Sequence, residues 1–337
     1  MSLSDQQTSP WAPEGSWLIV AGGAGFLGSN FTRLLLEAER NVVCIDDVST
    51  GRWENLAVLR ERFGDRLVTI EHDVRQPVLD VVRDRLGSTR AVGVCNLASP
   101  ASPPAYMARP IETLEVGSRG TQNLLDLALA HNARFLQAST SEIYGDPAVH
   151  PQPETYWGNV NPIGPRSVYD EAKRFGEALC CAYERSLGLD LRLVRIFNTY
   201  GPGMQADDGR VVTNFIHQAL AGQPLTIYGD GDQTRSFCYV DELVHGFWSL
   251  LQSNHRGPVN IGNPVEFTMM ELASLVLELT GSASVINFQD LPEDDPKQRQ
   301  PDITLATRVL GWEPTVALRT GLQHTIDWFS RAARDRP

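Results

Sequence analysis

Short apolar runs alternate with amphipathic stretches from residue 17 to residue 197 of this 337-residue chain. The apolar runs are rich in Val, Ile and Leu and are expected to form strands at 17–21, 41–46, 67–71, 91–97, 133–139 and 190–197. The stretches between them have helical periodicity, at 25–38, 53–63, 77–86, 111–131 and 168–187. This alternation predicts an α/β fold, a Rossmann-type doubly wound parallel sheet with helices on both faces.

The pattern changes after residue 199, where glycine and proline become frequent. Further helices are expected at 212–221, 241–253, 268–280 and 316–330. The sequence therefore predicts a disordered N-terminal lead over residues 1–16, a Rossmann domain over 17–199, and a smaller C-terminal lobe over 200–337. Some segments of the lobe are expected to return to the first domain.

Net charge and composition argue against two classes of binding partner, nucleic acids and membranes. The formal net charge is −12 and the chain has no basic block, so we expect no nucleic-acid partner. The apolar runs are all shorter than the ~20 residues of a membrane helix, so we expect no membrane partner either. The five cysteines form no C-x-x-C pair, which favours a reducing compartment and predicts a cytoplasmic protein without a metal site.

A glycine series, "GGAGFLG", joins the first expected strand to the first helix. Gly22, Gly25 and Gly28 would let the backbone turn tightly and approach a pyrophosphate at the helix N-terminus. Asp46, at the end of the second strand, would accept hydrogen bonds from a ribose diol, which favours NAD over NADP, although Arg52 lies nearby. Asp73 has two interpretations, an adenine contact or a helix N-cap.

Tyr169 and Lys173 lie four residues apart in "SVYDEAKR" and would share one helix face. A lysine ammonium beside a phenol lowers the pKa of the phenol, so we expect Tyr169 to act as a base. The expected strand before this helix ends in "STSEIYG", which places Thr140 and Glu142 at a strand end. Together with the glycine series, this pattern is far more specific than a Tyr-x-x-x-Lys spacing alone.

These motifs resemble the extended short-chain dehydrogenase/reductase family, which acts on nucleotide sugars. Longer segments resemble its UDP-glucuronate decarboxylase (UDP-xylose synthase) branch over residues 17–330: "LASPASPPAYM", "STSEIYGDPAVHPQPETYWGNVNPIGPRSVYDEAKR", "RIFNTYGPGMQADDGRVVTNFI", "YGDGDQTRSF" and "DDPKQRQPDI". The resemblance implies oxidation of UDP-glucuronate at carbon 4, loss of carbon dioxide from the 4-keto acid, and re-reduction to UDP-xylose by the same tightly held NAD.

The resemblance also implies roles for individual residues. Thr140 would bridge Tyr169 and the sugar hydroxyl, Glu142 would position the sugar and assist proton transfer, and Arg299 would help to organise the catalytic groups. The implied catalytic residues are Thr140, Glu142, Tyr169, Lys173 and Arg299. The implied cofactor residues are Gly22, Gly25, Phe26, Leu27, Gly28, Asp46, Thr50, Gly51, Arg52, Asp73, Val74, Leu97, Tyr169 and Lys173. The implied substrate residues, with arginines that suit phosphate, are Ser99, Asn198, Arg210, Tyr228, Arg235 and Arg299.

Alternatives within the family remain open: a 4-epimerase, a 4,6-dehydratase, or a catalytically weak NAD-binding homologue. Ser141 argues against a dehydratase, because the family's dehydratases have an acidic aspartate at that position and a serine hydroxyl is a poor acid. Four positions depart from the family pattern: Asn96, Glu115, Gly117 and Gly203. The resemblance also implies a homodimer formed through the helices at 111–131 and 168–187.

Overall fold

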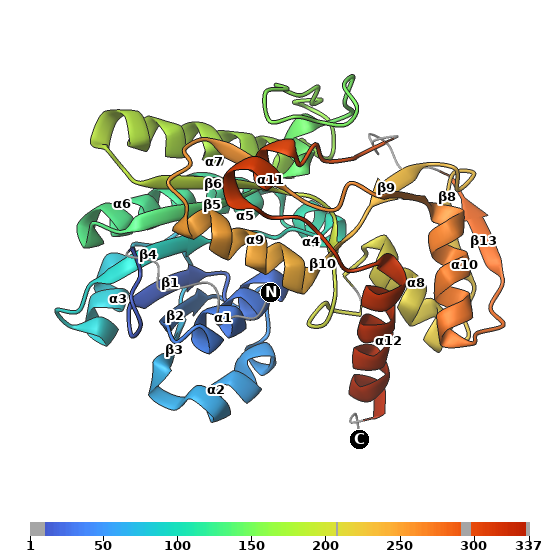
Figure 1. The fold of residues 1–337 in the computed structure, drawn as a ribbon, viewed down its shortest axis with the longest axis horizontal. Coiled ribbons are helices and arrows are strands. Elements are labelled where there is room, and N and C mark those ends of the chain that lie inside the picture. The colour runs from blue at the N-terminus through green and yellow to red at the C-terminus, as the bar shows by residue number, and fades with distance from the viewer. Residues whose placement is uncertain (1–10, 207, 291–297, 335–337) are drawn as a thin grey trace.

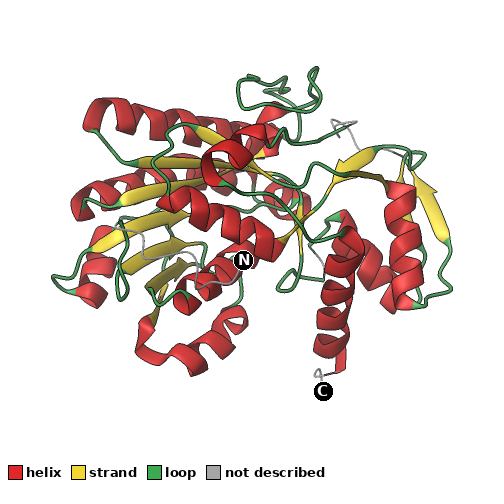
Figure 2. Ribbon diagram, viewed as in Figure 1, coloured by secondary structure: helices red, strands yellow, loops and turns green. Residues whose placement is uncertain are grey.

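A seven-stranded parallel sheet forms the centre of the molecule (Figures 1 and 2). The computed structural model describes residues 11–206, 208–290 and 298–334. In spatial order the strands are β11 (Pro258–Ile261), β6 (Leu191–Ile196), β5 (Arg134–Thr140), β4 (Ala91–Asn96), β1 (Trp17–Ala21), β2 (Asn41–Asp46) and β3 (Leu67–Glu71). The predicted doubly wound fold is confirmed.

Helices cover both faces of the sheet because successive strand residues point to opposite sides. Leu18 and Val20 belong to one core, and Ile19 and Ala21 to the other. The first core contains residues of α1 (Phe26–Glu37), α2 (Ala57–Phe63), α9 (Val240–Gln252) and α11 (Thr304–Leu310). The second contains residues of α3 (Leu79–Leu86), α6 (Thr121–His131) and α7 (Ser167–Leu187).

The sheet continues beyond residue 199 of the chain. Its edge strand β11 pairs with β6, and α9 and α11 pack against the same part of the sheet. Residues of the second half thus complete the first domain. No helix within residues 11–206, 208–290 and 298–334 has the length and apolar character needed to cross a membrane.

The rest of the second half forms a lobe with its own core, to the right of the sheet in Figure 1. Buried side chains of Phe215, Leu272 and Leu322 pack together there. The lobe contains α8 (Val211–Leu220), α10 (Met269–Thr280), α12 (Leu318–Arg334), β8 (Leu225–Tyr228) and β13 (Ile286–Gln289).

Several short elements carry no periodicity that sequence reasoning could detect. They are β7 (Thr199–Tyr200), β9 (Thr234–Ser236), β10 (Cys238–Tyr239), β12 (Glu266–Thr268), α4 (Pro103–Ala108) and the 3₁₀ turns Trp53–Leu56, Gly64–Arg66 and Ser141–Tyr144. The expected disordered lead extends too far. Residues 1–10 lie outside the described residues, but Ala12 is fully buried and the Trp11 ring lies 4.7 Å from the Arg134 guanidinium.

The expected helix at 111–131 is broken into three segments. These are α5 (Pro110–Glu115), a π-helical segment (Val116–Gly120) and α6. Gly117 of the π segment approaches α7 so closely that a Cβ atom there would lie 2.7 Å from the Cβ of Ala172. The close approach brings this segment against the helix that carries Tyr169 and Lys173.

Candidate active site

The glycine series forms the tight turn that the sequence predicts. Gly22 has a φ of +78°, and a Cβ atom on Gly28 would overlap the carbonyl oxygen of Gly22. Helix α1 starts directly after Gly25. The turn therefore presents backbone and a helix N-terminus, the arrangement that accepts a pyrophosphate.

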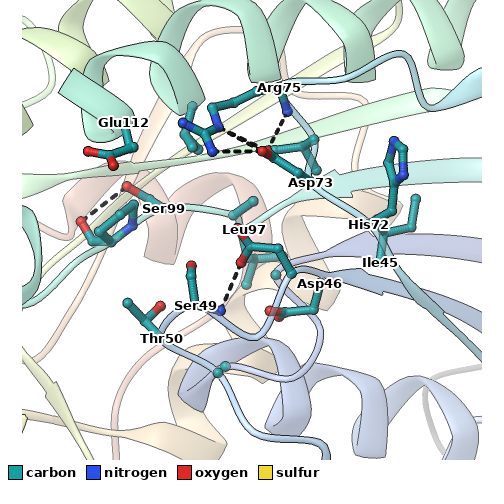
Figure 3. Close-up of a pocket in the computed structure, with 18 of the residues that line it drawn as sticks. Ile45, Asp46, Ser49, Thr50, His72, Asp73, Arg75, Leu97, Ser99 and Glu112 are labelled. Atoms are coloured by element: carbon teal, nitrogen blue, oxygen red, sulfur yellow. Dashed lines mark hydrogen bonds and ion pairs between the residues drawn. The ribbon is translucent and has the colours of Figure 1, made fainter. Parts of the chain in front are cut away.

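A pocket opens beside this turn, along the carboxyl ends of β1, β2, β3 and β4 (Figure 3). Of the predicted cofactor residues, those that line it are Gly22, Gly25, Asp46, Thr50, Gly51, Asp73, Val74 and Leu97. Those that do not line it are Phe26, Leu27, Gly28, Arg52, Tyr169 and Lys173. The predicted substrate residue Ser99 also lines it. Polar residues that the sequence reasoning missed are Asp47, Ser49, His72, Arg75, Arg109 and Glu112.

Asp46 connects the pocket wall to the glycine turn. Its carboxylate accepts hydrogen bonds from the backbone N–H groups of Ala24 and Val48, both at 2.9 Å. Burial raises the pKa of Asp46, while these backbone hydrogen bonds oppose the increase. An acceptor-only carboxylate in this wall suits a ribose diol and disfavours a phosphate, so the residues present fit NAD.

Asp73 is part of an ion-pair chain at the pocket rim (Figure 3). It accepts a 2.9 Å hydrogen bond from the backbone of Arg75 and a 2.8 Å bond from that guanidinium, which also reaches Glu115 at 3.0 Å. The helix N-cap interpretation of Asp73 is wrong, because α3 begins only at Leu79 and Asp73 instead closes a turn. Burial raises the pKa of Asp73, but the bonds from Arg75 outweigh it and leave the pKa lowered.

Tyr169 and Lys173 lie on one face of α7, as predicted, but they interact differently from expectation. The Lys173 ammonium donates to the carbonyl oxygen of Ala138 at 3.0 Å and lies 5.6 Å from the centre of the Tyr169 ring. Burial and the charge of Glu142 raise the pKa of Tyr169 to about 12, although the charge of Arg210 and a hydrogen bond with Thr140 oppose the increase. Burial also lowers the pKa of Lys173 to about 8. The expected lowering of the phenol pKa by Lys173 is therefore wrong for this arrangement.

Glu142 lies just past the end of β5 and is held by two arginines. One carboxylate oxygen accepts from Arg166 at 2.8 Å and the other from Arg299. Burial alone would raise the pKa of Glu142, but the two guanidinium groups lower it to about 2. Glu142 is thus an ionised carboxylate at neutral pH. Arg166 was missed, although it precedes Tyr169 by three residues in the family-like segment "GPRSVYDEAK".

Tyr106 of α4 was also missed as a site residue, and its ring covers the ring of Tyr169. The two rings are stacked, with centroids 5.1 Å apart and planes inclined by 9°. The Tyr106 side chain is 1% exposed, and its hydroxyl has no hydrogen-bond partner among the described residues. Its only signal in the sequence was its place in "LASPASPPAYM".

The predicted substrate residues are distributed unevenly around this centre. Arg210 donates to the carbonyl oxygen of Ala101 at 3.2 Å, and its charge acts on Tyr169. Arg235 is buried in β9 and precedes Ser236, which contacts the backbone of Arg299 at 3.4 Å.

The other two lie near the strand ends and on the lobe surface. Asn198 follows β6, whose Ile196 pairs with Thr140. Tyr228, at the end of β8, is 42% exposed; its backbone carbonyl accepts from Gln233, and it pairs with Gln289 of β13.

The four departures from the family pattern have structural partners. Asn96 donates to Gln137 at 3.0 Å, and Glu115 pairs with Arg75. Gly117 has no room for a side chain against Ala172, and Gly203 has a φ of +93°, which disfavours other residues. Each departure is therefore compatible with the local packing or backbone conformation at its position.

Comparisons with known proteins identify the family of this chain. The sequence pattern of the GDP-mannose 4,6-dehydratase family matches residues 19–325. UDP-glucuronic acid decarboxylase 5 of Arabidopsis thaliana is 48% identical, over 96% of this chain and 95% of the relative. UDP-glucuronic acid decarboxylase 1 of Danio rerio is 49% identical, over 93% of this chain and 72% of the relative.

Solved structures of similar proteins share the fold. UDP-glucose 4-epimerase from Thermotoga maritima, in complex with UDP-glucose, has a TM-score of 0.85 and 28% identity, over 94% of this chain and 99% of the other. A UDP-glucuronic acid 4-epimerase from Bacillus cereus, in complex with NAD and a 4-fluoro analogue of UDP-glucuronic acid, has a TM-score of 0.83, 28% identity and the same coverage. This chain therefore belongs to the GDP-mannose 4,6-dehydratase family of extended short-chain dehydrogenases/reductases, in which its 48–50% identical relatives are UDP-glucuronic acid decarboxylases.

Proposed function

We propose that this protein is an NAD-dependent UDP-glucuronate decarboxylase that forms UDP-xylose. The observation that carries the proposal is Glu142, a buried carboxylate fixed by Arg166 and Arg299 beside Tyr169 at the end of β5. The decarboxylases named above, related over most of the chain, supply the substrate class. NAD, when bound, supplies the acceptor and donor of the hydride at carbon 4.

Tyr169, Thr140 and Lys173 share the work of proton transfer. Tyr169 takes the proton of the carbon 4 hydroxyl during oxidation and returns it during reduction, and Thr140 relays it through the hydrogen bond that the two share. Lys173 donates to the Ala138 carbonyl in this structure, and a shift of its ammonium toward the phenol when NAD is bound would lower the pKa of Tyr169. The 4-keto acid loses carbon dioxide because the electrons of the bond between carbon 5 and the carboxylate pass into the adjacent ketone, giving an enolate. Carbon 5 of this enolate then takes a proton from water, which restores the ketone for reduction by the hydride.

Glu142 differs from a general acid in this scheme. Because its pKa is about 2, it holds no proton to donate at neutral pH. It instead orients the sugar and a proton-bearing water near carbon 5 while Arg166 and Arg299 hold it in place. Ser141 is 2% exposed and brings no acid that could expel a hydroxyl from carbon 6, which favours decarboxylation over a 4,6-dehydratase reaction.

We further propose that residues of the Rossmann sheet bind NAD, that the 200–337 lobe binds most of the UDP-sugar, and that the protein works in the cytoplasm as a homodimer. Exposed apolar side chains on α4, α5 and α7 support the dimer: Met107 is 50% exposed, Ile111 70%, Leu114 42% and Phe175 50%. Light scattering checks the oligomeric state, and a stable monomer at working concentration would contradict it.

The test of the function is a product assay. Purified protein with UDP-glucuronate and no added NADH should release carbon dioxide and yield UDP-xylose, identified by mass spectrometry. Tyr169→Phe is the control variant and should release neither. Formation of UDP-galacturonate alone would indicate a 4-epimerase, and no product with NAD supplied would indicate a catalytically weak homologue.

A further inference from the structure

Gln152 lies in the loop between the 3₁₀ turn Ser141–Tyr144 and α7, and it is fully buried although its side chain is polar. It forms an isolated β-bridge with Pro301. Pro301 lies two residues after Arg299, the arginine that donates to Glu142. Gln152 takes no part in the proposed chemistry, so its burial beside this arginine requires an explanation.

Backbone and side-chain hydrogen bonds join Gln152 to the residues that follow Arg299. The backbone N–H of Gln152 donates to the carbonyl of Gln300 at 2.9 Å, and the backbone N–H of Asp302 donates to the carbonyl of Gln152 at 3.0 Å. The side-chain Oε1 atom of Gln152 accepts from the backbone N–H of Gln300 at 2.9 Å. Gln300 is therefore held through both its N–H and its carbonyl, one residue from Arg299.

Asn260 of β11 fixes Gln152 to the sheet. Asn260 is fully buried, and its side-chain amide donates to the carbonyl of Gln152 at 2.9 Å and to that of Asp302 at 3.2 Å. Its Oδ1 atom accepts from the Tyr144 hydroxyl at 2.8 Å. Tyr144 belongs to the same 3₁₀ turn as Glu142. Buried hydrogen bonds thus connect the segment after Arg299 to the turn that carries the carboxylate.

The Arg299 side chain meets this turn through the end of its guanidinium. It donates to Glu142 and, at 3.4 Å, to the carbonyl of Gly145. Its Nε atom is buried and has no hydrogen-bond partner among the described residues. A guanidinium binds a carboxylate in a narrow range of geometries, so a displacement of the backbone at Arg299 would change its contact with Glu142.

We propose that Gln152 is a positioning residue that holds Arg299 against Glu142 and so fixes the orientation of this carboxylate during turnover. The effect on turnover rests on the proposed function, whereas the placement of Arg299 by Gln152 does not. Burial alone would raise the pKa of Glu142, and the charge of Arg299 is the first of the effects that lower it. Withdrawal of Arg299 should therefore raise the pKa of Glu142.

Other titratable and charged groups face Glu142 from neighbouring elements. Arg166 before α7 donates to it at 2.8 Å, and the phenols of Tyr106 on α4 and Tyr169 on α7 lie within range of its charge. Asp170, which follows Tyr169, is 6% exposed, and burial and then the charge of Glu142 raise its pKa to about 7. Because these groups are present in every protein compared, a difference between a Gln152 variant and the wild type reports on the change at Arg299.

Gln152→Met tests the proposal, because it removes the acceptor for the Gln300 N–H and the donor that reaches the Val149 carbonyl at 2.8 Å. Hydrogen exchange followed by mass spectrometry should show about tenfold faster exchange at Gln300 and Asp302, with unchanged exchange in β5. The kcat with UDP-glucuronate should fall about 10- to 100-fold, as expected for a displacement of about 1 Å at a catalytic group. The Kd for UDP, which lacks the sugar, should stay within about twofold in calorimetry.

The pH profile gives a further measurement. If the pKa of Glu142 rises, more of this carboxylate is protonated at a given acidic pH, so the loss of kcat on the acid side should begin at higher pH in Gln152→Met than in the wild type, within about pH 4 to pH 6. Gln218→Met is the matched control. Gln218 of α8 also accepts from a backbone N–H, that of Thr226, at 3.0 Å, but within the lobe. It should lower Tm and leave kcat, the acid limb and exchange at Gln300 at wild-type values.

Unchanged exchange at Gln300 and Asp302 in Gln152→Met would overturn the proposal, as would faster exchange with a kcat within about twofold of wild type. Equal losses of kcat and UDP binding without a shift of the acid limb would indicate a general structural role and would also overturn it. If Gln152→Met does not fold, Gln152→Asn, which withdraws the amide by one methylene group, is measured against the same outcomes. Exchange requires no turnover, so a wild-type protein inactive on UDP-glucuronate would refute the proposed function while the exchange result still decides whether Gln152 holds this segment.

Discussion

Gly117 offers a sharp test of how packing positions the catalytic helix. In Gly117→Ala, the new Cβ would lie 2.7 Å from the Cβ and 2.9 Å from the carbonyl oxygen of Ala172, whereas ordinary contact is 3.4–4 Å. The π segment and α7 must therefore separate by up to about 1 Å. Overpacking of this kind costs about 1–3 kcal/mol, which exceeds the ~0.5–1 kcal/mol that alanine gains over glycine in a helix.

The same helix pair provides the matched control. Gly176 lies one turn further along α7, and a Cβ there would meet its nearest neighbours, Gln137 and Gly117, at 3.5 and 3.6 Å. Gly176→Ala should therefore raise the free energy of unfolding by about 0.5–1 kcal/mol. For a chain of this length, 1 kcal/mol corresponds to a change in Tm of roughly 1–2 °C.

The assay combines thermal unfolding with turnover of UDP-glucuronate. Gly117→Ala should lower Tm by about 1–3 °C and lower kcat by about 10- to 100-fold, because Lys173 follows Ala172 and a displacement of 1 Å at a catalytic group costs up to about 100-fold. Gly176→Ala should raise Tm and leave kcat nearly unchanged. If both variants are equally stabilised and fully active, the inference that Gly117 sets the position of α7 is wrong.

Glu142→Gln should lower kcat by about 10²–10⁴ while UDP binding, measured by calorimetry, stays within twofold; equal losses in both would indicate a structural carboxylate. Arg75→Ala should weaken NAD binding about two- to fivefold in a fluorescence titration, because Asp73 and Glu115 lose their counter-charge. The control is Arg83→Ala, which removes an exposed arginine and should leave NAD binding unchanged. Asp170→Asn should gain stability over wild type as pH rises from about 4 to about 7. Between these pH values the Asp170 carboxyl is ionised in the unfolded chain but still protonated in the folded protein, so the wild type loses stability as pH rises and Asp170→Asn does not. Urea midpoints of the two proteins that differ by the same amount at every pH would contradict this.

The sequence was sufficient for the parts of the fold that repeat a pattern. Strands such as 17–21 and 41–46 are nearly continuous apolar runs, because both faces of the central sheet are buried. Such runs can be recognised without knowledge of the rest of the fold. The break at Val116–Gly120 could not be predicted in the same way. Gly117 in this segment packs against Ala172, which is distant in the chain, and local propensity does not report such a contact.

In the candidate site, too, residues set by local spacing could be predicted, whereas contacts between distant segments could not. Tyr169, Lys173 and Glu142 follow from short spacings and strand ends, so the sequence could place them. The hydrogen bonds from Arg166 and Arg299 to Glu142 join three separate segments that meet only in the folded chain. The pKa of Tyr169 was misjudged for a related reason, since spacing puts Lys173 on the same face but the carbonyl of Ala138 decides where its ammonium lies.

The path of the chain between the sheet and the lobe has a practical consequence. After residue 199 the chain enters the lobe, returns for α9 and β11, leaves for α10, returns again for α11 and ends in α12 (Figure 1). A single cut cannot separate the two parts: a fragment ending at residue 199 would expose the backbone of β6 along a new sheet edge and would lack Arg299. A movement of the lobe relative to the sheet would therefore have to bend several chain connections at the same time.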